Sequence, residues 1–127
     1  MMDVYREILP DSYLLILADA AHAAGEKVLQ RALQRACSSG KASVWVDCSQ
    51  LPELPAEVLQ LLGNYYELLQ SKQVNLVLCH LADGLQGTVQ ALPGHQRPPV
   101  VATLLEAASY CRSQPTRRHR TYTAIAA

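Results

Sequence analysis

The chain alternates between short apolar runs and longer segments with helical spacing. The apolar runs that predict strands are residues 13–17, 44–46, 74–79 and 99–101. The first run follows the turn residues Pro10, Asp11 and Ser12, so we expect it to pair as a hairpin with residues 4–8. The two middle runs are apolar at consecutive positions, which is typical of strands covered on both faces.

Segments with helical spacing lie between and after these runs. The predicted helices are residues 24–37, 56–70, 85–92 and 104–111. In the first of them, Val28 and Ala32 begin an apolar i, i+4 row opposite charged and amide side chains, which predicts a surface helix with one buried face. Thr103 and Glu106 have the spacing of a capping box at the start of the last helix.

The order of these elements predicts the fold class. Residues 44–46, the helix that follows and residues 74–79 make a strand–helix–strand unit, so the two strands should be parallel. We therefore expect one α/β domain, with a mixed sheet of about four to five strands and helices packed mainly on one face. The domain is predicted to span residues 1–114. Residues 115–127, which carry three arginines, are expected to form a flexible basic tail.

Composition and charge exclude several classes of protein. Half of the 127 residues are hydrophobic, which is enough for a buried core. The charges of eleven basic and eleven acidic residues cancel. The sequence has no cluster of Lys and Arg typical of a nucleic-acid-binding face, so we expect no nucleic-acid binding. No apolar run approaches the roughly 18 residues that a membrane span needs, so we expect no membrane insertion. The first ten residues have no apolar core typical of a signal peptide, and a cytoplasmic location is predicted.

Candidate catalytic chemistry is sparse. The four cysteines are widely spaced, and the sequence contains no phosphate-binding glycine loop, no GxSxG and no HExxH motif. We therefore expect no enzyme activity, no metal and no cofactor. Asp47 and His80 follow two strands that should be adjacent and parallel, where ligand sites of open α/β sheets gather. They form a candidate small-molecule site, although Asp47 could instead accept backbone N–H bonds from residues 48–50.

The run from residue 13 to residue 111 resembles a STAS domain, the sulfate-transporter and anti-sigma-factor-antagonist fold. The resemblance depends on the helix at 24–37, the segment SVWVDCS at 43–49, the helix after Pro55, and the strand at 74–79 before LADG at 81–84. The segment TLLEAA at 103–108 is similar to the start of the family's last helix. The resemblance implies a regulatory domain that binds another protein.

The resemblance also indicates where the sequence departs from the family. The loop before the second helix usually reads Asp-Ser-x-Gly-Leu in that family, and its hydroxyl is phosphorylated by a partner kinase. The matching positions here are residues 55–59, which places Ala56 at the phosphoacceptor position. Alanine has no hydroxyl, so a switch at this residue is not expected. Glu53 and Glu57 flank the turn, and a fixed carboxylate there could partly imitate the phosphorylated state.

The family's partner face corresponds to the loop and first helical turn after residue 50. The expected partner-binding residues are Leu51, Glu53, Leu54, Pro55, Ala56 and Glu57. Candidate partners are an anti-sigma kinase-like protein or the ATPase subunit of a transport system. Because the leucines and prolines of this loop appear exposed in the sequence, self-association is also expected to be feasible. The alternatives are the small-molecule site near Asp47 and His80, or a structural homodimer.

Overall fold

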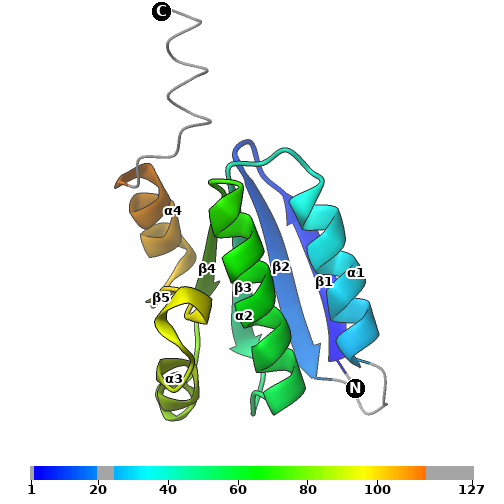
Figure 1. The fold of residues 1–127 in the computed structure, drawn as a ribbon, viewed down its shortest axis with the longest axis vertical. Coiled ribbons are helices and arrows are strands. Elements are labelled where there is room, and N and C mark those ends of the chain that lie inside the picture. The colour runs from blue at the N-terminus through cyan, green and yellow to red at the C-terminus, as the bar shows by residue number, and fades with distance from the viewer. Residues whose placement is uncertain (1, 20–24, 114–127) are drawn as a thin grey trace, which may run out of the picture.

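The computed structural model describes residues 2–19 and 25–113 (Figure 1). Its strands are β1 (Met2–Ile8), β2 (Ser12–Asp19), β3 (Ser43–Gln50), β4 (Asn75–Cys79) and β5 (Val100–Val101). Its α-helices are α1 (Gly25–Cys37), α2 (Ala56–Ser71), α3 (Asp83–Gln90) and α4 (Leu104–Ser113), and a 3₁₀ turn, η1, spans Gly94–Gln96. The predicted tail at residues 115–127 lies outside the described residues.

The five strands form one mixed sheet in the order β1-β2-β3-β4-β5. β1 and β2 pair antiparallel, which confirms the predicted hairpin, and Leu9 closes its turn by donating its N–H to the carbonyl of Ser12 at 2.9 Å. The pairs β2–β3, β3–β4 and β4–β5 are parallel. The predicted strand–helix–strand unit is therefore confirmed, with α2 as its crossover.

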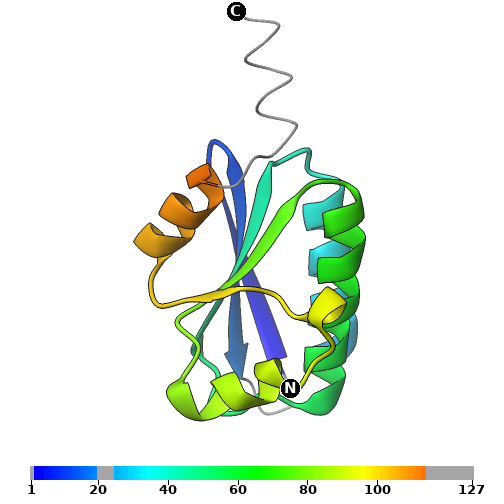
Figure 2. The same ribbon diagram turned by 60° about the vertical axis from the view of Figure 1, so that its left-hand side comes forward.

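Helices cover the two faces of the sheet unequally (Figure 2). α1 and α2 lie over one face, where side chains such as Leu15, Val46 and Leu78 form the larger core with them. α4 lies on the opposite face, where Ala107 packs with Trp45 and Val77 in a smaller core. Alternate residues of each strand point to opposite faces, so β3 contributes to both cores. The predicted α/β class, with helices mainly on one face, is confirmed.

α4 is tied to the chain by hydrogen bonds at both ends. Thr103 Oγ1 accepts the N–H of Glu106 at 3.1 Å, as in the predicted capping box. The Glu106 carboxylate bonds one residue earlier than the motif predicts, because it accepts the N–H of Ala102 at 2.9 Å. Near the other end, Trp45 Nε1 donates to Cys111 Sγ at 3.4 Å. Within residues 2–19 and 25–113, no helix is long and apolar enough to cross a membrane.

Candidate functional site

The loop between β3 and α2 is only partly exposed, which corrects one sequence-based expectation. Leu51 and Leu54 were expected on the surface, but they are 6% and 7% exposed and belong to the larger core. β3 continues to Gln50, and the Leu51 N–H donates to the carbonyl of Cys48 at 3.1 Å, which turns the chain back over the sheet. These two leucines therefore anchor the loop and leave no exposed apolar stretch.

The remaining loop residues face the solvent. Glu53, Pro55, Ala56 and Glu57 are exposed, and α2 begins at Ala56. Pro55 occupies the N-cap with no side-chain cap, while its carbonyl accepts the Leu59 N–H at 3.0 Å. Glu57 lies in the first turn, where the helix dipole favours a negative charge. The loop thus exposes two carboxylates on a turn that the buried side chains of Leu51 and Leu54 anchor to the core.

An open groove of about 510 Å³ adjoins this first turn. Its walls come from α1 and α2, and its lining consists of Gln30, Ala56, Glu57, Gln60, Leu61 and Asn64. Two of the predicted partner-binding residues, Ala56 and Glu57, therefore lie at a groove. The sequence did not predict Gln30 at this surface, because only the packing of α1 against α2 brings it there. Its position on the polar face of the predicted helix indicated only that its side chain would be exposed.

One wall of the groove is held by side-chain hydrogen bonds. Asn64 Oδ1 accepts from Gln60 Nε2 at 3.0 Å and from Gln96 Nε2 at 3.2 Å. Gln96 also donates to Glu67 Oε1 at 3.1 Å. These bonds join α2 to η1, which lies more than 20 residues later in the chain. Side-chain hydrogen bonds therefore hold this surface of α2 against η1.

Asp47 and His80 lie at the same end of adjacent strands, as predicted. Asp47 pairs with Cys79 in the β3–β4 register, and His80 follows with a left-handed φ of 57°. Asp47 is only 9% exposed, and its Oδ1 accepts the Ser49 N–H at 2.9 Å. This bond is of the kind expected if Asp47 has a structural role, in which its carboxylate accepts backbone N–H bonds from the loop that follows. No hydrogen bond joins Asp47 to His80 in the described chain, and neither lines the groove.

The buried thiols are held in their protonated form. Burial, with smaller contributions from the carboxylate of Asp47 and the neighbouring Cys79, raises the pKa of Cys48 to about 12. Burial also raises the pKa of Cys79 to about 12, again with contributions from Asp47 and from Cys111. Across residues 2–19 and 25–113, no group of three or more His, Cys, Asp or Glu side chains could hold a metal ion.

The raised thiol pKa values predict a loss of stability at alkaline pH. A thiol whose pKa is higher in the folded state stabilises that state fully below its ordinary pKa, and this contribution falls as pH rises toward about 12. At pH 10 the loss of this Cys48 contribution should lower the free energy of unfolding by about 1 kcal/mol. Urea unfolding at pH 8 and pH 10 measures this. Cys48→Ala should lose about 1 kcal/mol less over the same interval, and an equal loss in both proteins would contradict the assignment.

Comparison with known proteins identifies the fold. No protein-family model matches the sequence, and no curated protein matches it either. Solved structures do match: an anti-sigma factor antagonist from Mycobacterium paratuberculosis has a TM-score of 0.72 at 12% identity, over 89% of this chain and 96% of that one. A serine-to-glutamate variant of RsbS from Moorella thermoacetica has a TM-score of 0.73 at 12% identity, over 86% and 94%.

A third similar structure is an anti-sigma-factor antagonist (STAS) domain protein from Planctomyces limnophilus. Its TM-score is 0.68 at 13% identity, over 87% of this chain and 98% of that one. All three superpose over nearly the whole described domain, so the chain has the STAS fold. The fold implied by the sequence resemblance is confirmed. At this level of identity the likeness establishes the fold alone.

Proposed function

We propose that this STAS-fold domain is a non-catalytic regulatory module that binds a protein partner at the groove between α1 and α2. The observation that carries the proposal is the continuity of the exposed turn, Ala56 and Glu57, with that groove. The similar structures include anti-sigma factor antagonists, whose description implies action on another protein. The partner type that we propose is an anti-sigma kinase-like protein or the ATPase subunit of a larger assembly, in the cytoplasm.

The charge of the turn favours a partner with basic or N–H donor groups. Glu53 and Glu57 are exposed carboxylates, and neither forms an ion pair within the described residues. The amides of Gln30 and Gln60 can donate or accept, so they suit a polar partner surface. Ala56 has no hydroxyl, so in this proposal binding is not switched by phosphorylation at that position. Glu57 instead provides a permanent negative charge.

Affinity capture from the native lysate, read by mass spectrometry, tests the proposal. Glu57→Lys reverses the charge at the groove, and Glu7→Lys makes the same change on an exposed residue of β1. We expect the wild-type protein and Glu7→Lys to capture the same ATP-binding partner and Glu57→Lys to lose it at least tenfold. Ala56→Tyr adds bulk at the groove without changing the charge and should also reduce capture.

Two outcomes would contradict this function. Capture that is equal for Glu57→Lys, Ala56→Tyr and Glu7→Lys would exclude the groove as the binding surface. Capture of no protein besides the bait would favour the alternatives. Sedimentation at increasing protein concentration would then detect a homodimer. A thermal-shift screen of small molecules, run on the wild-type protein and on Asp47→Asn, would detect a ligand that binds at the strand ends near His80.

A further inference from the structure

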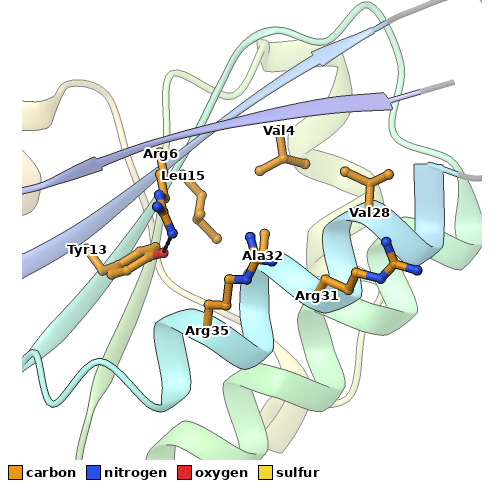
Figure 3. A pocket seen from close by; sticks show the side chains of 8 residues that line it. All are labelled: Val4, Arg6, Tyr13, Leu15, Val28, Arg31, Ala32 and Arg35. Atoms are coloured by element: carbon orange, nitrogen blue, oxygen red, sulfur yellow. Dashed lines mark hydrogen bonds between the residues drawn. The ribbon is translucent and has the colours of Figure 1, made fainter.

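A cavity of about 180 Å³ lies between α1 and the β1–β2 hairpin, away from the groove that α1 forms with α2 (Figure 3). Its lining side chains are Val4, Arg6, Tyr13, Leu15, Val28, Arg31, Ala32 and Arg35. None of them lines the groove between α1 and α2. The cavity therefore belongs to a separate surface from the proposed partner site, and a ligand bound in the cavity would not occupy that site.

The inner part of the cavity is apolar. Leu15 is fully buried in the larger core, and Val4, which lies next to Arg6 on the same face of β1, packs against that core. On α1, Val28 and Ala32 are one helical turn apart and face the hairpin (Figure 3). The side chain of alanine is too small to fill the space between helix and hairpin. An apolar recess remains beneath the surface.

The rim of the cavity carries three guanidinium groups. Arg6 extends from β1, while Arg31 and Arg35 lie on successive turns of α1 (Figure 3). Arg6 Nη1 donates to the hydroxyl of Tyr13 at 3.5 Å. Among the residues that the structure describes, no carboxylate forms an ion pair with any of the three arginines.

This concentration of positive charge is not explained by the fold. Arg35 lies in the last turn of α1, where a cation stabilises the helix dipole. Arg31 and Arg35 are four residues apart, however, and like charges at this spacing destabilise a helix. The acidic residues of β1, Asp3 and Glu7, point to the opposite face of the hairpin, because side chains alternate along a strand.

We propose that this cavity binds a small organic anion, with its carboxylate at the arginines and a short alkyl or aryl body in the apolar recess. Guanidinium groups match the planar geometry of a carboxylate and can donate two parallel hydrogen bonds to it. An apolar cavity of about 150 Å³ can hold benzene, so the recess has room for one ring or a chain of about six carbons. A bound anion would also relieve the repulsion between Arg31 and Arg35.

Titration of the full-length ¹⁵N-labelled chain with hexanoate, followed by NMR chemical shifts, tests the proposal. Hexanol has a similar body without the charge, and acetate has the charge without the body. We expect hexanoate to bind at least tenfold more tightly than either, with shifts concentrated on β1, β2 and α1. Hexyl phosphate distinguishes a carboxylate site from a general oxyanion site, since tighter binding of the phosphate would overturn the carboxylate assignment.

Matched variants separate the charged rim from the apolar recess. Arg31→Gln should weaken hexanoate binding about tenfold, whereas Arg112→Gln, which removes the same charge from α4, should leave it unchanged. Ala32→Leu fills the recess while it keeps every arginine, and should abolish binding of hexanoate with little effect on acetate. Equal binding of hexanol and hexanoate, equal weakening by Arg31→Gln and Arg112→Gln, or shifts outside the hairpin and α1 would each overturn the proposal.

Discussion

Leu54→Ala is expected to lower the free energy of unfolding by about 2–5 kcal/mol, although its residue lies in a loop. Leu54 is 7% exposed and packs in the larger core, so truncation removes buried apolar surface and leaves a cavity. The loss is a large part of the roughly 5–15 kcal/mol that stabilises a domain. Equilibrium unfolding in urea, followed by the fluorescence of Trp45, measures the change.

The neighbouring residue provides the control for this prediction. Glu53 is exposed, so Glu53→Ala should change the free energy of unfolding by no more than about 0.5 kcal/mol. Equal stability of the two variants would mean that the loop is not anchored by its leucines. The comparison also matters for binding experiments, because loss of a partner on substitution of Leu54 would report unfolding of the loop and not the loss of a direct contact.

Gly63→Ala is expected to destabilise the protein by about 1–3 kcal/mol, opposite to the usual effect in a helix. Alanine in a helix interior is normally better than glycine by roughly 1 kcal/mol. Gly63 is buried in α2, however, and a Cβ there would lie 2.9 Å from the carbonyl oxygen of Gln96 and 3.2 Å from its Cβ. The turn that carries Gln96 would have to move away, and its hydrogen bonds to Asn64 and Glu67 would be disturbed.

A second helical glycine makes the prediction specific. Gly87 lies in α3, and no atom outside its immediate neighbours is within 4 Å of a Cβ built on it. Gly87→Ala should therefore raise the free energy of unfolding by about 0.5–1 kcal/mol. Thermal or urea unfolding of the two variants should give changes of opposite sign. A stabilising effect at both positions would show that η1 can move away from α2 without lowering the free energy of unfolding, which would contradict the prediction.

Local patterns were sufficient to predict most of the fold. Consecutive apolar residues predict β3 and β4 because both of their faces are covered, and the crossover rule then makes them parallel. The hairpin follows from Pro10, Asp11 and Ser12 between two strand-like runs. Boundaries were less accurate: α3 begins at Asp83, two residues before the predicted start, since neither residue before Leu85 contributes to the apolar pattern.

The surfaces were harder to predict, because they depend on which segments meet in space. Leu51 and Leu54 each precede a proline, so the sequence suggests an exposed loop, yet the extension of β3 to Gln50 turns both leucines inward. The groove combines α2 with Gln30 of α1, and the arginine-rimmed cavity combines Arg6 of β1 with Arg31 of α1, 25 residues later. Neither pairing has a local signature. The partner-binding role of the loop remains a prediction.

The order of strands has a consequence for the solubility of the chain. β1 and β5 lie at the two edges of the sheet, and β1 is seven residues long whereas β5 has only two. A long unpaired edge can add the strand of another molecule and so begin aggregation. Asp3, Arg6 and Glu7 place alternating charges along β1, and such charges oppose pairing between identical edges. Arg6, which frames the arginine cavity from the hairpin side, thus also helps to keep the molecules apart.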